Sequence, residues 1–408
     1  MKRIIKFQIL FLFLFTALFI SCGSVPKTYT MEQAEENTIL QVSGVQDERT
    51  PKDTLTLLFA GDIMAHNVNY YVSSYDKIWR DVKYLIEPAD LAFANIEAPI
   101  DTTKPASSYP SFNMTKKYVI AAIDAGFDVF SLCNNHTNDQ YAAGIRETIK
   151  TTTELTKEFS QKGRSIYFSG LKTSEQAQFT YNIINRNGWK IIFIPITELL
   201  NRPDASELVN YVRPNEKSRL QFIELIKKIK SENECDLFII SVHTAEPEYT
   251  RNVTEAQDSF YMNLLENGAD IVWANHAHII KNRKIVSDTR INRDKIIMYA
   301  NGNTISGQRT KPEFYAHNPN SERDNTGDGL FYKITIQKNN ANKSLKLLKA
   351  EPLFITTYIN TANEYVIKPL NSQFVEYLYS VPRKDWAKYI EKRIKINNKE
   401  TKDFIIWQ

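Results

Sequence analysis

Histidines, carboxylates and asparagines stand where the apolar runs of this sequence end. His276 and His278 follow the largely apolar run 269–273 and are separated by one residue. Two imidazoles at this spacing, on a loop that leaves a buried strand, can point at one atom, which is a common way to hold a transition metal. The next question is whether the chain supplies the remaining ligands.

Further side chains of the ligand type stand at the ends of other runs. In chain order the whole set is Asp62, His66, Glu97, Asn135, His136, His243, His276 and His278. Carboxylate, imidazole and amide oxygen together suit borderline divalent ions such as Mn, Fe or Zn, whereas an all-oxygen set suits Mg or Ca. Eight such side chains exceed the needs of one tetrahedral ion, so we predict two divalent metal ions that share a bridging group.

Each of these residues has a structural alternative when it is taken alone. His243 could be a hydrogen-bonded structural histidine at a strand end, and Asp62 or Glu97 could cap a helix. Independent structural roles would not place histidine, carboxylate and asparagine at the ends of successive buried strands. The joint pattern therefore favours a metal site.

The elements that must position these residues are short apolar strands alternating with helices. Strands are predicted over residues 55–60, 89–94, 128–132, 165–168, 190–196, 237–242, 270–273, 296–299, 330–336 and 345–353. Helical spacing predicts helices over residues 78–86, 118–125, 141–159, 217–231, 255–265, 374–379 and 385–394. This alternation predicts an α/β domain whose central strands are buried on both faces and whose carboxyl-end loops form the site.

The amino end has the order of a secretion signal. Three basic residues precede the apolar stretch 7–20, which is too short for a comfortable membrane span, and Ser21 and Cys22 follow it. We predict a bacterial lipoprotein signal over residues 1–22, with lipid on Cys22. An uncleaved anchor or an ordinary secretory signal is the alternative. We therefore expect the protein in the cell envelope, lipid-anchored to a membrane and facing the periplasm or the exterior.

The rest of the chain is predicted to form one large domain. Residues 23–53 are polar and predict a flexible tether, the domain covers 54–364, and a helical extension packed on it covers 365–408. Within the domain, residues 308–329 lack a periodic pattern and predict either a mobile lid or a disordered loop.

Charge and cysteine content exclude two classes of protein. After the first 22 residues the chain has 48 basic and 47 acidic side chains, which gives no support for a nucleic-acid partner. Beyond Cys22 only Cys133 and Cys235 remain, each in an apolar strand context. Buried thiols are therefore favoured over a disulfide framework.

Six short motifs, in order, resemble those of a known family. They are Gly61-Asp62, Asn95-x-Glu97-x-Pro99, Asn134-Asn135-His136-x-x-Asp139, Val242-His243, His276-x-His278 and Ala300-Asn301-Gly302-Asn303. Together they resemble the bacterial capsule-synthesis family of CapA type, which is associated with poly-gamma-glutamate. That family is itself similar to the calcineurin-like metallophosphoesterases. The resemblance covers residues 54–336.

The resemblance implies a calcineurin-like sandwich of two central mixed sheets flanked by helices, with C-terminal strands and helices added. The ligand roles that it implies are Asp62 and His278 on the first metal, Glu97 as the bridging carboxylate, and Asn135, His243 and His276 on the second metal. His66 is a further predicted ligand, although its spacing from Asp62 is longer than the family's.

The resemblance also implies catalytic and substrate-binding residues. His136 matches a histidine that contacts substrate and serves as general acid or transition-state donor, and Asn134 and Asp139 belong to the same motif. We predict substrate contacts from Asn95, Asn303 and Arg309. The backbone amides of a turn at Gly302 and Asn303 could receive an anion, and a plain turn is the alternative.

Two functions from different classes fit these features. The first is a metal-dependent hydrolase, in which metal-activated water attacks a phosphoester or an amide of an anionic polymer, linked to capsule or poly-gamma-glutamate synthesis or processing. The second is a membrane-tethered accessory protein that binds or exports an anionic polymer without cleaving it. The expected partners are the polymer or phosphoester and the membrane, through the N-terminal lipid, and we expect no nucleic acid.

Overall fold

The architecture is that of a computed structural model, which describes residues 50–313 and 322–408. The predicted signal 1–22 with Cys22, nearly all of the predicted tether, and part of the segment 308–329 lie outside the described residues. Among the residues that are described, no helix combines the length and the apolar composition needed to cross a bilayer.

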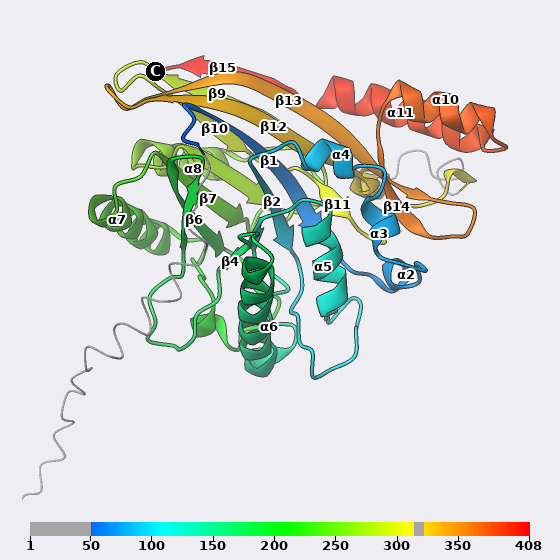
Figure 1. The fold of residues 1–408 in the computed structure, drawn as a ribbon, viewed down its shortest axis with the longest axis horizontal. Coiled ribbons are helices and arrows are strands. Elements are labelled where there is room, and N and C mark those ends of the chain that lie inside the picture. Colours follow the sequence, from blue (N-terminus) through cyan, green and yellow to red (C-terminus); the bar gives the residue numbers. More distant parts are fainter. Residues whose placement is uncertain (1–49, 314–321) are drawn as a thin grey trace, which may run out of the picture.

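The strands form an α/β sandwich (Figure 1). One half contains β4 (Tyr167–Ser169), β3 (Val129–Ser131), β2 (Leu91–Ile96), β1 (Thr54–Ile63), β12 (Asp328–Asn339) and β13 (Ser344–Ile359). The other contains β10 (Arg293–Met298), β8 (Ile271–Asn275), β7 (Leu237–His243), β6 (Trp189–Thr197) and β5 (Asn182–Arg186). Both halves are mixed, as predicted. They are joined into one hydrogen-bonded sheet by the single register pair Arg293–Leu345.

The inner strands of both halves are parallel. Strand β1 pairs with β2, β2 with β3, and β3 with β4 in parallel register, and β6, β7, β8 and β10 are parallel in the same way. Strands β12, β13 and β5 add antiparallel pairs. Because parallel strands end at the same edge of a sheet, the carboxyl ends of β1, β2, β3, β7 and β8 deliver their polar residues to one place.

Aromatic packing between the halves fixes the position of those strand ends. The rings of Phe59 and Phe93 stack with centroids 4.7 Å apart, and Trp273 of the opposite half lies 5.9 Å from Phe59. The Trp273 indole Nε1 donates a hydrogen bond of 2.8 Å to the carbonyl of Ala60. Ala60 stands two residues before Asp62, and Trp273 stands three residues before His276, so this contact sets the spacing between β1 and β8 near the site.

Helices cover the outer faces of the sandwich. Helices α5 (Lys116–Asp124) and α6 (Tyr141–Gln161) pack on the first half, and α7 (Glu216–Glu232) and α8 (Glu255–Glu266) pack on the second. Side chains of Thr115, Asn215 and Thr254 accept backbone hydrogen bonds at the starts of α5, α7 and α8. The short helices are α2 (Asn67–Tyr70), α3 (Asp76–Trp79), α4 (Lys83–Ile86) and the 3₁₀ turns η1 (Ser206–Leu208) and η2 (Glu322–Gly327).

The single helix predicted over 78–86 is wrong, because the chain forms α3 and α4 with a break between them. The apolar residues that suggested one helix, Trp79, Val82 and Ile86, are all buried in the same core. The backbone leaves helical geometry at Val82 (φ −124°, ψ −7°), and the break lets all three side chains reach that core.

The C-terminal segment 365–408 contains two helices, as expected, and also two strands. Its elements are β14 (Tyr365–Pro369), α10 (Ser372–Ser380), α11 (Lys384–Glu400) and β15 (Asp403–Trp407). Strand β14 pairs with β13, and β15 pairs with β9 (Arg283–Asp288). This segment thus extends the sheet in two places as well as packing helices on it. Strand β11 (Asn303–Ile305), which pairs with β1, stands where a turn was predicted.

The two cysteines of the described domain are free. Cys133 is buried and Cys235 is partly buried. The expectation of buried thiols rather than a disulfide is therefore confirmed for Cys133 and, in its partial burial, for Cys235.

Candidate metal centre

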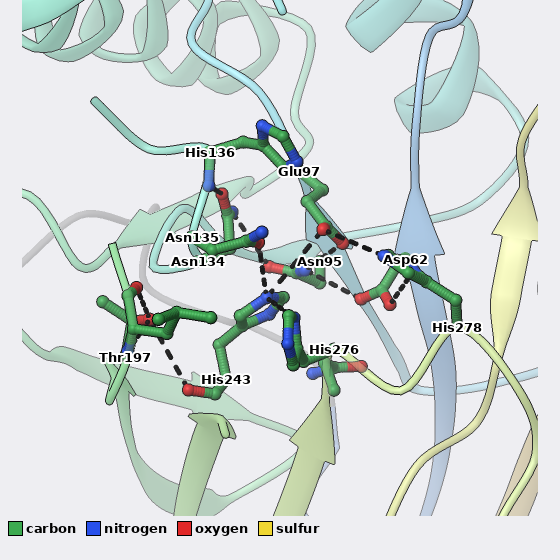
Figure 2. Close-up of polar contacts among 12 residues, drawn as sticks. Asp62, Asn95, Glu97, Asn134, Asn135, His136, Thr197, His243, His276 and His278 are labelled. Atoms are coloured by element: carbon green, nitrogen blue, oxygen red, sulfur yellow. Dashed lines mark hydrogen bonds and ion pairs between the residues drawn. The ribbon is translucent and has the colours of Figure 1, made fainter. Parts of the chain in front are cut away.

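Glu97 lies at the centre of a buried polar cluster at the carboxyl edge of the sheet (Figure 2). Its Oε1 is 3.6 Å from His278 Nε2 and 3.8 Å from His243 Nε2. This oxygen is buried and has no hydrogen-bond partner. A buried carboxylate oxygen is costly unless it is paired, and the two imidazole nitrogens that face this one at 3.6 and 3.8 Å leave room for a cation between them.

On one side of Glu97 lie Asp62 and His278. His278 Nδ1 is 3.0 Å from Asn303 Oδ1 and 3.3 Å from Asp62 Oδ2. Because both neighbours are acceptor oxygens, Nδ1 carries the ring proton, and Nε2 keeps a lone pair that faces Glu97. Asn95 Nδ2 donates a hydrogen bond of 2.8 Å to Asp62 Oδ1 and lies 3.5 Å from Glu97 Oε2. Asn95 therefore holds the two carboxylates in place.

On the other side lie His243, His276 and Asn135. His243 Nε2 is 2.8 Å from Asn135 Oδ1 and 3.2 Å from His276 Nδ1. The Asn135 amide nitrogen donates to Asn201 Oδ1 at 3.3 Å, which fixes the amide with its oxygen toward His243. Three atoms that can each offer a lone pair thus converge, and a cation between them would satisfy all three.

Burial and neighbouring charges shift the pKa values of the side chains in this cluster. Burial, together with the negative charge of Asp62, raises the pKa of Glu97 well above its usual value. Burial also lowers the pKa of His243, and burial and the neighbouring His278 lower that of His276 to about 4. Burial acts to lower the pKa of His278 too, but the hydrogen bond and charge of Asp62 outweigh it and leave that pKa raised. Neutral His243 and His276 keep lone pairs for a metal.

The donor set fits divalent metal ions. Two groups of three residues bring one ligand atom each to within 4.8 Å of one another: Glu97 with His276 and His278, and Asp62 with Glu97 and His243. Both groups contain Glu97, which agrees with a shared carboxylate. The groups mix residues that the sequence assigned to different ions, so the division of ligands between two ions stays a prediction.

The backbone at the histidine pair is strained. His276 has φ 98° and His278 has φ 55°, in the region that residues with a side chain rarely adopt. Such conformations persist when the surrounding contacts determine them, and they concentrate at functional sites. Here they turn both rings toward Glu97 from a single loop, as Figure 2 shows.

The residues with predicted catalytic roles lie beside this cluster. His136 Nδ1 is 2.7 Å from Asp139 Oδ2 and 3.1 Å from Asn201 Nδ2. Asn134 is buried, and its amide donates to the carbonyl of Ile96 at 2.7 Å while its Oδ1 accepts the backbone N–H of His136. Asp139 thus orients the imidazole, and Asn134 fixes the loop that carries it.

An open cavity of 580 Å³ gives access to the cluster. His136 and Asp139 line it together with two of the clustered ligands, Asn135 and His278, so part of the ligand set and the predicted catalytic group face one space. His66 also lines the cavity, but its Nδ1 accepts the backbone N–H of Gly307 at 3.1 Å and it belongs to neither three-residue group. The structure therefore places His66 in the wall rather than in the ligand cluster.

The residues predicted to contact substrate do not line this cavity. Arg309 is fully buried and pairs with Asp324 and Asp328, so the structure does not bring it to the site. Asn95 positions carboxylates, as described above. Asn303 donates to Thr326 O at 2.9 Å and accepts from His278, so it orients a ligand instead of meeting substrate.

Among the cavity residues that the sequence analysis missed are Asn201, Arg202, Glu248 and Arg323. A Glu248 carboxylate oxygen is 3.9 Å from His276 Nε2. The Arg202 guanidinium lies 3.8 Å over the ring of Tyr141, and its Nε donates to Asp204 at 3.2 Å. Asn201 and Arg202 follow the strand predicted over 190–196, so the strand-end rule could have found them, whereas nothing in the sequence marks Arg323.

Two solved structures are similar to this chain at low level. They are a hypothetical protein from Thermus thermophilus, at 14% identity and TM-score 0.41 over 74% of this chain and 98% of that one, and the calcineurin-like phosphoesterase YfkN from Bacillus subtilis, at 13% identity and TM-score 0.37 over 83% of this chain and 99% of that one. Because both TM-scores are below 0.5, these likenesses carry no further conclusion.

Two curated relatives are similar in sequence. The capsule biosynthesis protein CapA of Bacillus anthracis is 26% identical over 274 residues, which cover 64% of this chain and 62% of the relative. The PGA biosynthesis protein CapA of Bacillus subtilis (strain 168) is 24% identical over 264 residues, covering 63% of this chain and 64% of the relative. The match thus spans a little under two thirds of each relative.

The family profile described as bacterial capsule synthesis protein PGA_cap matches residues 56–308. This range runs from β1 to the loop after β11, and it includes Asp62, Glu97, His243 and the histidine pair at the strand ends. The match covers more than half of the chain, and the motifs that suggested the family are the ones that converge in the structure. The chain therefore belongs to the PGA_cap family of bacterial capsule synthesis proteins.

Proposed function

We propose that this protein is a metal-dependent hydrolase of the cell envelope that acts on an anionic substrate. The observation that carries the proposal is the partnerless Glu97 Oε1, which faces His278 on one side and His243 on the other inside a buried cluster. A cluster with this donor set is suited to two divalent ions of the Mn, Fe or Zn type.

The residues of the site have two proposed roles, metal ligand and general acid. Asp62, Glu97, Asn135, His243, His276 and His278 would hold the ions. When bound, such ions lower the pKa of a water molecule and stabilise negative charge that develops on the substrate. His136, oriented by Asp139, faces the cavity and is placed to donate a hydrogen bond or a proton to the leaving group.

Two arginines at the cavity wall support the proposed substrate class. Arg202 and Arg323 both line the cavity, and cationic side chains at its wall favour a substrate with negative charge near the scissile bond. One of the relatives is named for PGA biosynthesis. A phosphoester, or an amide of an anionic polymer such as poly-gamma-glutamate, would suit this site.

The proposed location and partners come from the sequence. A lipid on Cys22 would anchor the protein to a membrane and leave residues 23–53 as a tether, so that the site faces the periplasm or the exterior. The partners would be the anionic substrate and the membrane, without nucleic acid. Failure of labelled palmitate to enter the wild-type chain, or its equal incorporation into Cys22→Ser, would contradict the anchor.

The direct test is elemental analysis combined with a hydrolysis screen. We expect the purified chain to contain stoichiometric divalent metal and to hydrolyse a member of a panel of phosphomonoesters, phosphodiesters and gamma-glutamyl peptides. His278→Ala should lose metal and activity together. His66→Ala is the matched comparison for metal content, because this histidine stands outside the cluster, and it should keep the metal.

The same experiment separates the proposal from the non-catalytic alternative. A wild-type chain that binds labelled polyglutamate but turns over no member of the panel, and whose binding survives replacement of His136 and His243 by alanine, would favour an accessory polymer-binding role. A chain without stoichiometric metal would contradict the hydrolase.

A further inference from the structure

A stripe of lysines runs along the exposed face of α11. It consists of Lys384, Lys388, Lys392, Lys395 and Lys399, at spacings of four, four, three and four residues. All five are exposed, while the opposite face of the helix is buried in the domain. Residues at these spacings share one face of a helix, so the stripe forms a line roughly 22 Å long. We call it the lysine stripe.

Two lysines of α7 are paired with acids of the same helix, and these lysines provide the comparison for the lysine stripe. On α7, Lys227 lies 2.8 Å from Glu224, and Lys228 lies 3.8 Å from Glu232. On the lysine stripe, Lys399 lies 3.4 Å from Glu400 at the end of the helix. A row of cations on one helix face creates a positive potential that a negatively charged surface can meet.

Exposed apolar side chains follow directly after the lysine stripe. Phe404 is 49% exposed, Ile405 is 60% exposed and Trp407 is 74% exposed, all on β15. Strand β15 pairs with β9 on one side, and in the described part of the chain no other strand pairs with it. Figure 1 shows α11 and β15 following one another along one border of the molecule. Large apolar side chains gathered on an exposed edge strand mark an interaction surface.

We propose that the lysine stripe and the β15 edge together form a docking surface for an anionic lipid bilayer. Lysines attract the negative headgroups, and Ile405 and Trp407, which share one face of β15, gain free energy by entering the boundary between headgroups and acyl chains. A soluble anionic polymer would meet the lysines equally well, but it offers nothing to Ile405 and Trp407. The apolar edge therefore selects the bilayer over the polymer.

Trp407 provides a local readout of docking in the full chain. The other four tryptophans, Trp79, Trp189, Trp273 and Trp386, are buried, and residues 1–49 contain none. The emission of Trp407 is the part of the wild-type emission that is absent from Trp407→Phe. Vesicles of equal parts phosphatidylglycerol and dibrominated phosphatidylcholine should quench this part. Vesicles of dibrominated phosphatidylcholine alone should quench it much less. Because the N-terminus is the same in every variant, its own affinity for lipid does not enter the comparison.

The decisive variant removes three charges from the lysine stripe: Lys384→Gln, Lys388→Gln and Lys395→Gln together. Each lysine near an anionic surface contributes about fivefold to binding, so the docking equilibrium should fall on the order of 100-fold. The matched control removes three exposed lysines of α7, Lys217, Lys227 and Lys228, in the same way and should change docking less than about twofold.

Three outcomes would overturn the proposal. The first is wild-type Trp407 emission that anionic brominated vesicles leave unchanged. The second is equal quenching of the α11 triple variant and the α7 control. The third is binding of soluble polyglutamate that the triple variant loses while vesicles never quench Trp407, which would assign the lysine stripe to a polymer. Circular dichroism of each variant verifies that α11 is still folded.

Discussion

Two clusters of buried charged side chains lie close together in this protein, and they differ in how their carboxylates are neutralised. The candidate metal centre around Glu97, which we call the metal cluster, has carboxylates that face histidines. The second cluster, which we call the arginine lock, pairs Arg309 and Arg393 with Asp324 and Asp328, all of them almost fully buried. One cluster is open to an added cation, and the other is already neutralised.

The two arginines and two aspartates of the arginine lock neutralise one another, although Asp324 Oδ2 has no hydrogen-bond partner and lies 3.7 Å from Arg393 Nη1. Arg393 Nε donates to Asp328 Oδ2 at 2.7 Å, and Asn397 Nδ2 donates to the same oxygen at 2.7 Å. Arg309 contacts the other oxygen of Asp328 and donates to Thr357 O at 3.0 Å. Burial would raise the pKa of Asp328, but Arg393 and Arg309 outweigh burial and hold that pKa below its usual value.

The difference between the clusters shows which one is structural. Arginines of the chain neutralise the carboxylates of the arginine lock, whereas imidazoles and an amide face Asp62 and Glu97 and leave room for a cation. Asn303 links the two clusters through hydrogen bonds. Its Nδ2 donates to the carbonyl of Thr326, which lies between Asp324 and Asp328 in the sequence, and its Oδ1 accepts from His278 Nδ1. The arginine lock therefore braces the loop behind the metal cluster without sharing its chemistry.

The largest expected effect comes from breaking the arginine lock. Arg393→Met leaves Asp328 buried with one arginine fewer, and such losses cost about 3–5 kcal/mol of unfolding free energy. Chemical denaturation of the metal-free chain measures this. The matched control is Arg290→Met, which removes a surface arginine paired with Asp288 at 2.8 Å and should have a much smaller effect. Equal losses from the two variants would contradict the comparison.

The sequence predicted the metal cluster better than the arginine lock, for a physical reason. The ends of the apolar runs carry Asp62, Glu97, Asn135 and His243 or directly precede them. Parallel strands bring these ends to one edge of the sheet, and this does not depend on the conformation of the loops. The strand periodicity that identifies the runs is local, so the convergence follows from local signals.

The arginine lock depends on contacts that no local pattern marks. Arg309 follows the Gly302-Asn303 motif and was therefore predicted to meet substrate, but its acid partners stand 15 and 19 residues later, and the lock is closed by Arg393 from α11. Strand β15 was missed in the same way, because its partner β9 lies 120 residues earlier. Pairings over such distances are decided by packing and leave no periodicity in the sequence.

Lys281 is a third kind of buried charge, a cation whose Nζ has no hydrogen-bond partner. Burial lowers its pKa from 10.5 to about 8, and Glu246 offsets only part of this. The unfolded chain then holds a proton that the folded chain gives up between pH 8 and 10.5, so stability rises with pH across this window. Below pH 8 the cost is complete, at about 3 kcal/mol.

Replacing this lysine should therefore stabilise the protein. Lys281→Met should raise the unfolding free energy at pH 7 by an amount approaching about 3 kcal/mol and should flatten its rise with pH. Denaturation at several pH values measures both effects. The contrasting variant is Lys295→Met, because the Lys295 Nζ donates to Leu265 O at 2.7 Å and lies 3.8 Å from Asp288, so its removal should raise stability less than Lys281→Met does. A Lys281→Met chain that is less stable at pH 7 would show that its amine has a partner.

The smallest expected change tests the metal cluster itself. Burial and the charge of Asp62 make an ionised Glu97 costly in the metal-free fold, so Glu97→Gln should be more stable than wild type by about 1–2 kcal/mol. Added Mn²⁺ or Zn²⁺ at a hundred times its dissociation constant should stabilise wild type by about 3 kcal/mol and the variant far less. A loss of stability in metal-free Glu97→Gln would mean that the cluster is neutralised in the way the arginine lock is. The opposite signs expected for Glu97→Gln and Arg393→Met distinguish a site kept open for a ligand from one closed by its own side chains.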